Sequence, residues 1–310
     1  MLHASLAAPY TAAAEAEKGT LSGGAKITAD TSASGGKAVE FMGASSNGGA
    51  SGGGSGSSSG GSSSGGSSGT GAGNGIPKSA SNECALEGGN VDGAGCYFWG
   101  QGIQSNLTAT GAQVTMSATA PKVSSQDYHS DSEIYVATDN ESDSVEVCAI
   151  VGPDSPTPHL LVDYWKNGGV YDNDFVPVSG APIQNGGAMP TTGTYTITVK
   201  YVNTQWQVYY DNQEIGYYPE SVWGSGVFTQ AQFVDIYGEV EGTATNETTS
   251  QMGNGLLGTD PNSAYFSNYS LIGTSTAPDL TVAGPSGAAA NVYKVGYATP
   301  TGFHYGGPGF

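Results

Sequence analysis

Turn-forming residues interrupt the chain every ten or so residues from Cys84 to the C-terminus. Between them lie short runs rich in Val, Ile and aromatic residues, without the period of an amphipathic helix. This spacing is typical of an all-β sandwich or barrel. We therefore expect an antiparallel β-sandwich of two packed, curved sheets. The predicted strands are 97–103, 113–118, 133–137, 145–151, 159–166, 194–202, 206–210, 213–218, 232–241, 264–271 and 291–295.

The N-terminal part of the sequence has a different composition. Residues 44–75 are almost wholly Gly, Ser, Ala and Asn, and such a tract cannot bury apolar surface. We predict an Ala/Gly/Thr-rich segment at 1–43, a disordered Gly/Ser-rich linker at 44–80 and the β-sandwich at 81–310. The first segment is interpreted as a pro-segment or a signal remnant, and the composition leads us to expect a secreted protein.

Charge narrows the range of partners. The chain has 27 acidic residues against 8 lysines, has no arginine, and carries a formal net charge of -19. Nucleic acid is not expected as a partner, because phosphate binding needs clustered basic residues. No membrane partner is expected either, because no apolar run is long enough to span one. With so few cations to form ion pairs, the fold is predicted to tolerate low pH.

The three cysteines are Cys84, Cys96 and Cys148. Cys84 and Cys96 bracket a Gly-rich loop and are candidates for a disulfide in an oxidising compartment, which would leave Cys148 unpaired. No Cys or His spacing matches a zinc site. We therefore expect no metal and no cofactor.

Two glutamates stand out from the alternation of the strands that carry them. In 145–151 the odd positions are apolar, so Glu146 shares a face with Cys148 and Ile150. In 234–241 one face is Val and Ile, and Glu239 lies on the other. If 133–137 and 145–151 pair as a hairpin, Tyr135 falls roughly opposite Glu146.

A pair of carboxyl groups across a sheet can catalyse hydrolysis. One, ionised, takes a proton from water, and the other, protonated, donates to the developing oxyanion or the leaving group. Glycosidases and acid peptidases both use such pairs. A strand carboxylate can equally be a solvated outer-face residue. The residues alone leave three alternatives open: a peptidase, a glycosidase, and a non-catalytic module that binds carbohydrate or cell wall.

Several short motifs follow one another in a fixed order. Upstream are S-E-I-Y-V at 132–136, V-E-V at 145–147 and Y-W at 164–165. Downstream are G-Y-Y-P at 216–219, Y-G-E-V at 237–240, T-S-Q-M-G-N-G at 249–255, A-Y-F at 264–266 and Y-G-G-P-G at 305–309. In this order, from Cys84 to Phe310, they resemble the neprosin family. Its members show G-Y-W-P, W-G-G-E-V, T-x-M-G-S-G and Y-G-G-P-G.

The resemblance implies a β-sandwich glutamic endopeptidase that cleaves after proline in acid, and a proline-containing peptide or protein as substrate. It places the two catalytic glutamates at Glu146 and Glu239 without saying which is the base. We expect a monomer. Residues expected to bind substrate, from the same motifs, are Glu133, Tyr135, Tyr164, Trp165, Tyr218 and Tyr237.

This sequence departs from the family pattern at several of these positions. Tyr218 and Tyr237 stand where the family has tryptophan, and Glu133 stands where it has glutamine. Cys148 replaces a glycine, and Ala149 replaces a tryptophan. The width of the substrate cleft and the preference for proline are expected to depend on these changes.

Overall fold

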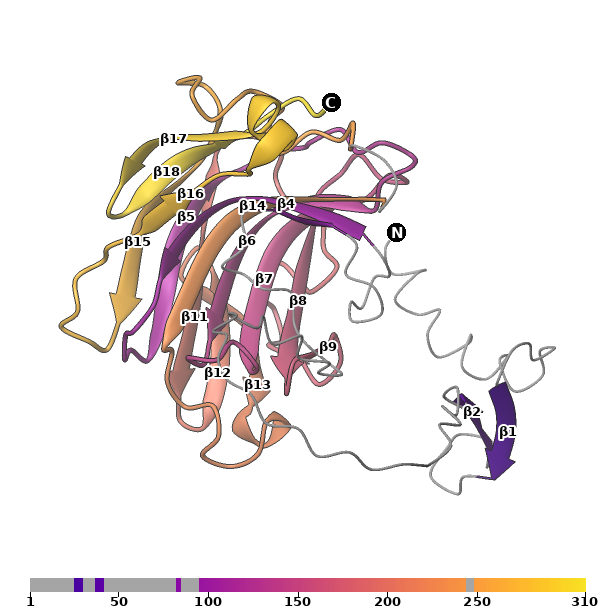
Figure 1. Ribbon diagram of the computed structural model, residues 1–310. Coiled ribbons are helices and arrows are strands. Elements are labelled where there is room, and N and C mark those ends of the chain that lie inside the picture. The colour runs from indigo at the N-terminus through magenta and orange to yellow at the C-terminus, as the bar shows by residue number, and fades with distance from the viewer. Residues whose placement is uncertain (1–24, 30–36, 42–81, 85–94, 244–247) are drawn as a thin grey trace, which may run out of the picture. The chain divides into compact units, whose positions relative to one another are not determined.

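The computed structural model describes residues 25–29, 37–41, 82–84, 95–243 and 248–310 (Figure 1). The chain divides into two compact units, Met1–Thr70 and Gly71–Phe310. In the first unit, β1 (Ala25–Ala29) pairs antiparallel with β2 (Lys37–Phe41). The predicted linker at 44–80 lies outside the described residues, as does most of the segment 1–43. The three-part division therefore stays a prediction.

The second unit holds two antiparallel sheets. Sheet I has the strand order β16-β4-β14-β6-β7-β8-β9, with β3 beside β4. In Figure 1 its central strands β4, β14, β6, β7 and β8 lie side by side. The bounds are β3 (Asn82–Cys84), β4 (Gly95–Gln104), β6 (His129–Ala137), β7 (Ser144–Val151), β8 (His159–Lys166), β9 (Gly169–Tyr171), β14 (Phe233–Thr243) and β16 (Thr281–Ala283).

Sheet II has the order β10-β13-β12-β11-β5-β15-β18-β17. Its bounds are β5 (Gly111–Ser117), β10 (Val176–Pro177), β11 (Thr194–Val202), β12 (Gln205–Tyr210), β13 (Gln213–Pro219), β15 (Ala264–Ile272), β17 (Lys294–Thr299) and β18 (Gly302–Gly306). Two short 3-10 helices, η1 (Glu220–Val222) and η2 (Gly287–Asn291), complete the described elements. Among the described residues, no helix is long and apolar enough to cross a membrane.

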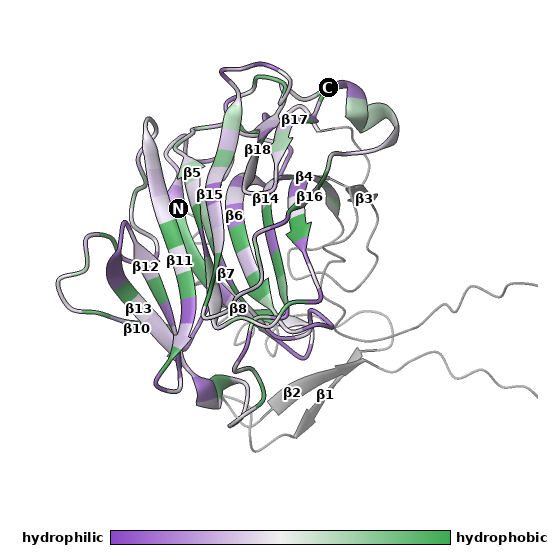
Figure 2. Cartoon of the chain, turned by 90° about the vertical axis from the view of Figure 1, so that its left-hand side faces the viewer, coloured by the Kyte–Doolittle hydropathy of each residue, from purple (hydrophilic) through white to green (hydrophobic). Residues whose placement is uncertain are grey.

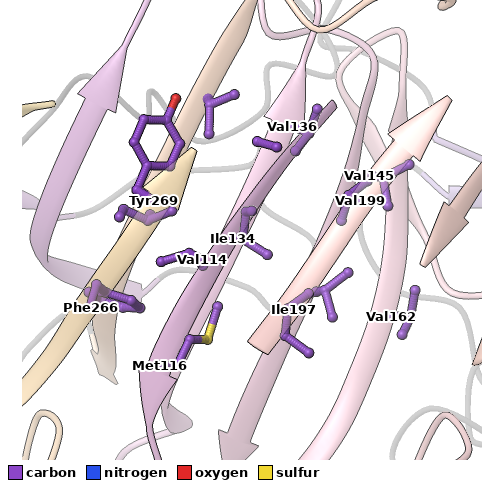
Figure 3. Close-up of a cluster of buried hydrophobic side chains, with 14 of the residues drawn as sticks. Val114, Met116, Ile134, Val136, Val145, Val162, Ile197, Val199, Phe266 and Tyr269 are labelled. Atoms are coloured by element: carbon purple, nitrogen blue, oxygen red, sulfur yellow. The ribbon is translucent and has the colours of Figure 1, made fainter. Parts of the chain in front are cut away.

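The core lies between the two sheets. Apolar side chains recur at every second position along the strands, which Figure 2 shows as alternating bands of hydropathy. Ile134 and Val145 of sheet I and Val114, Ile197 and Val199 of sheet II are fully buried in one cluster, drawn in Figure 3. Burying this shared apolar layer is the main force that holds the sheets together.

The predicted all-β sandwich is confirmed. The prediction was wrong at the C-terminus, where 291–295 was expected to be a strand. The Ala-rich stretch before it forms η2, and the strand there is β17, beginning at Lys294. A further strand, β18, was not predicted and lies between β15 and β17.

Candidate active site

The two faces of sheet I differ in chemistry. Val145 and Val147 lie in the core between the sheets, whereas Glu146 and Cys148 point to the opposite face. We call this opposite face the polar face of sheet I. Its acidic members are Asp131, Glu133, Glu146, Asp163, Asp235, Glu239 and Glu241, and all but Asp163 are buried. Carboxylates are rarely buried without partners, so such a face needs a specific network.

The strand register brings the two glutamates to neighbouring regions of this face. Glu239 on β14 lies between Trp99 on β4 and Asp131 on β6. Glu146 on β7 lies between Tyr135 on β6 and Asp163 on β8. The predicted register, with Tyr135 opposite Glu146, is confirmed. One strand, β6, separates the two glutamate-bearing strands.

Glu239 is held by two donors. The indole N–H of Trp99 donates to its Oε2. The His129 ring lies on the other side, with Nε2 3.0 Å from Glu239 Oε1. His129 also lies 3.4 Å from Asp131 Oδ2 and, through Nδ1, 3.3 Å from Glu241 Oε2. One imidazole is thus surrounded by three carboxyl groups.

These contacts set the charge of His129. Burial alone would lower its pKa, but the hydrogen bond to Glu239 and the charges of Glu241, Asp131 and Glu239 raise it to about 10. His129 is therefore an imidazolium at neutral and acid pH. Glu239 thus accepts hydrogen bonds from a cation and from an indole N–H.

Among the described residues, Glu146 contacts a different set of groups. The indole N–H of Trp165 donates to its Oε2 at 2.5 Å. The hydroxyl of Tyr237 lies 2.6 Å from Glu146 Oε1 and also hydrogen-bonds Glu133. Burial and the charges of Glu133 and Glu146 raise the pKa of Tyr237 well above its ordinary value, so the phenol keeps its proton.

The Tyr237 contacts imply a protonated carboxyl group. A phenol has one hydrogen and can donate it to one acceptor at a time, while an ionised carboxylate can only accept. For the contacts to Glu133 and Glu146 both to be hydrogen bonds, one of the two carboxyl groups must supply the second proton. The set Glu133–Tyr237–Glu146 therefore holds a proton close to Glu146.

Two groups of potential metal ligands lie on the polar face among the described residues. One is His129, Asp131 and Glu239, and the other is Asp131, Glu133 and Cys148. Metal ligands must be deprotonated. His129 is charged, and burial, with the nearby carboxylates, raises the pKa of the Cys148 thiol well above its ordinary value. Both groups are therefore poor metal sites at neutral pH, and the prediction of a metal-free site stays a prediction.

The structure separates the other predicted substrate-binding residues into two sets. Tyr135 and Trp165 lie on the polar face in a cluster with Tyr237, and the Tyr135 hydroxyl donates to Glu141 O at 2.8 Å. Tyr164 and Tyr218 instead belong to the core cluster, with ring centroids 4.9 Å apart. They therefore do not share a face with the two glutamates, and their role in substrate binding stays a prediction. Tyr164 is next to Trp165, so it points to the other face of β8, and Tyr218 projects from sheet II.

The cysteines fit the predicted pattern in part. Cys96 is disulfide-bonded, and Cys148 is free and buried. In the backbone register of β3 and β4, Cys84 is the residue opposite Cys96. The pairing of Cys84 with Cys96 stays a prediction.

Sequence reasoning missed Trp99, His129 and Gln101. All three lie on the polar face, and Gln101 pairs in register with Tyr237. A signal for two of them was present in β4, where Tyr97, Trp99 and Gln101 alternate with Phe98, Gly100 and Gly102. His129 has no such signal, because its three carboxylate neighbours come from its own strand and from β14.

Comparisons with known proteins identify one family. Residues 126–308, more than half of the chain, match the family described as Neprosin. Among curated proteins, no relative matches the chain.

Three of the similar solved structures have low sequence identity to this chain and low TM-scores. Scytalido-glutamic peptidase with a transition state analog inhibitor is 10% identical, covers 67% of this chain and 96% of its own, and has a TM-score of 0.44. SCP-B, a member of the eqolisin family of peptidases in complex with a tripeptide, has the same identity and coverages and a TM-score of 0.40. The homodimeric agglutinin CG-16 from chicken liver is 13% identical over 46% of this chain and 96% of its own, with a TM-score of 0.29. At these scores the similarities carry no argument about function.

Proposed function

The chain belongs to the neprosin family, and on that premise we propose that it is a glutamic endopeptidase whose base is Glu239 and whose acid is Glu146. One observation supports these roles more than any other: besides a tryptophan indole, the two glutamates contact groups that differ in charge. Glu239 faces the imidazolium of His129, and Glu146 faces the proton-holding pair Tyr237 and Glu133. Pairs of titratable groups in contrasting environments are the usual basis of acid and base assignments.

In the proposed reaction, the Glu239 carboxylate takes a proton from a water molecule, whose oxygen forms a bond to the scissile carbonyl carbon. The carbonyl oxygen becomes an oxyanion, which the protonated Glu146 stabilises by donating a hydrogen bond. Breakage of the C–N bond then needs a proton on the leaving nitrogen, and Glu146 supplies it. The products are a carboxylic acid and an amine. Glu239 then releases its proton to solvent and Glu146 takes one up, which restores both groups.

Both carboxyl groups are needed, which gives a direct test. Glu146→Gln and Glu239→Gln should each lower kcat/KM for a proline-containing peptide at acid pH by about a hundredfold to ten-thousandfold, the usual contribution of acid–base catalysis. Glu214→Gln, on β13 of sheet II, is the matched control and should keep full activity. Circular dichroism checks that all three variants fold. Full activity in either site variant would refute the assignment.

Specificity, pH range and location are parts of the same proposal. We expect cleavage after proline, an acid optimum and secretion. Mass spectrometry of the fragments of a protein substrate gives the cleavage position, and a chelator or pepstatin should leave the rate unchanged. Turnover of a glycoside, or tight oligosaccharide binding without proteolysis at any pH, would instead favour the two alternatives that the sequence left open.

A further inference from the structure

Gln101 is a buried amide on the polar face. It lies in the middle of β4, its side chain is 1% exposed, and among the described residues neither its Nε2 nor its Oε1 has a hydrogen-bond partner. A Cβ at either neighbour, Gly100 or Gly102, would meet Tyr305 or Phe303 of the core, so Gln101 itself points away from the core. An amide in this position loses its hydrogen bonds to water without gaining others, which costs stability.

The position of Gln101 connects it to both halves of the candidate site. Tyr237, its register partner on β14, hydrogen-bonds Glu146 and Glu133. Trp99, two residues before it on the same strand and therefore on the same face, donates to Glu239. A ligand group that reached the Gln101 amide would therefore lie beside Trp99 and Tyr237, the residues that hydrogen-bond Glu239 and Glu146.

The same strand contains a second buried glutamine, which shows what such an amide binds. Gln104 donates from Nε2 to Ala277 O at 2.9 Å and accepts from Asp279 N at 3.0 Å. Its side chain is thus satisfied by main-chain peptide groups, one as acceptor and one as donor. A primary amide offers this same combination to any peptide group that approaches it.

We infer that the Gln101 side chain binds a main-chain peptide group of the substrate, donating Nε2–H to its carbonyl and accepting its N–H at Oε1. The inference rests on the proposed function for the substrate class, since it takes the ligand to be a peptide. Gln101 is then a substrate-positioning residue that fixes the register of an extended chain running across the polar face to Glu239 and Glu146. It is neutral, so it adds no charge to an already acidic face.

The test uses a peptide that binds without being cleaved. In the Glu146→Gln background, calorimetry measures the affinity of a proline-containing hexapeptide and of copies in which each backbone N–H in turn is methylated. One methylation should weaken binding about tenfold to a hundredfold, as expected for a lost hydrogen bond in a buried site. Adding Gln101→Met should weaken binding of the unmethylated peptide by a similar factor. In that variant the methylation should have no further effect on affinity.

Gln104→Met is the matched control. It should lower the Tm by several degrees, because it leaves Asp279 N and Ala277 O without their partner. It should leave unchanged how the affinity depends on the position of the backbone methyl group. Gln101→Met should leave the Tm unchanged or raise it, because it removes an amide without partners. If Gln101 had a purely structural role, Gln101→Met would instead lower the Tm.

The outcomes separate this inference from the proposed function. If Gln101→Met in the otherwise native chain cleaves peptides at the wild-type kcat/KM, the inference is wrong and the peptidase assignment stands. If the native chain cleaves no peptide but binds one through Gln101 as described, the assignment is wrong and the inference stands. If no peptide binds, or if only an oligosaccharide depends on Gln101, the inference is wrong.

Discussion

Each of the two glutamates accepts a hydrogen bond from a tryptophan indole, but their other partners differ in charge. Trp99 and His129 hold Glu239, while Trp165 and Tyr237 hold Glu146. The indoles donate to both carboxyl groups alike, so they do not distinguish the two glutamates. The proton balance of the site is therefore set by His129 on one side and by Tyr237 on the other.

His129 should make stability depend on pH in a specific window. Its pKa is raised to about 10 in the folded protein, against an ordinary value of 6.5. The stabilisation is fully present below pH 6.5 and is lost as the pH rises to about 10, because the unfolded chain gives up this proton first. We expect the free energy of unfolding to fall by roughly 4–5 kcal/mol across this window.

Urea denaturation at several pH values measures this loss. His129→Gln should flatten the curve between pH 6.5 and 10, whereas His304→Gln, on β18, should keep the wild-type slope. A wild-type protein whose stability is constant over this window would show that His129 titrates normally.

Tyr237→Phe tests the shared proton. The ring lies in an aromatic cluster and should stay in place, but both Glu133 and Glu146 lose the hydroxyl. We expect kcat to fall about tenfold to a hundredfold, the effect of losing one hydrogen bond to a charged group. The pH–rate profile should also shift, because Glu146 and Glu133 then share a proton without the phenol between them.

Tyr293→Phe is the control for this experiment. Its hydroxyl is also buried and donates to Ser250 O at 2.7 Å, away from the polar face. It should lower stability without altering the pH–rate profile. An unchanged profile in Tyr237→Phe would exclude the proton-sharing arrangement.

At the scale of elements, β14 depends on the C-terminal strand β18 beneath it. A Cβ at Gly238 would lie 2.0 Å from the Tyr305 ring, so only glycine fits between Tyr237 and Glu239. The Tyr305 hydroxyl in turn contacts Ser132 Oγ on β6 at 2.5 Å. The Y-G-G-P-G motif thus supports the strand that carries Glu239.

Gly238→Ala should therefore impair both stability and activity. Overpacking of a close contact costs about 1–3 kcal/mol, and displacing β14 moves Tyr237 and Glu239 together. Gly169→Ala on β9 is the control, because the nearest atom to its Cβ is 3.5 Å away. Combining Gly238→Ala with Tyr305→Leu should recover part of the loss, and strictly additive effects would contradict the proposed contact.

Alternation along single strands predicted which face of its own strand each glutamate occupies, but it could not predict what lies across the sheet. It put Glu146 and Glu239 each opposite the apolar face of its strand, and the hairpin register placed Tyr135 correctly. The contacts of Glu239 with Trp99 and His129 depend on β4 and β6 flanking β14, an order that sequence spacing does not contain. Tyr164 was expected to bind substrate from a motif alone, and the structure places its ring in the core cluster, on the other face of β8 from Trp165.

At the scale of the whole molecule, the charge balance sets the response to acid. The chain has 27 acidic residues and 8 lysines. Most carboxylates therefore have no lysine to pair with, and protonating them relieves repulsion more than it breaks ion pairs. The buried imidazolium of His129 adds stability that is complete below pH 6.5. The relief of repulsion favours the fold in acid, and the imidazolium contributes for as long as the carboxylates around it are ionised.

We therefore expect the protein to remain folded down to about pH 3, inside the pH range in which the loss of paired carboxylates usually causes acid unfolding. Thermal melts followed by near-ultraviolet circular dichroism between pH 2 and 8 measure this. Added salt should raise the Tm at pH 7, where it screens repulsion among carboxylates, and should have little effect at pH 3, where they are protonated. A cooperative loss of the near-ultraviolet signal near pH 4 would show that ionised carboxylates stabilise this fold more than their repulsion weakens it.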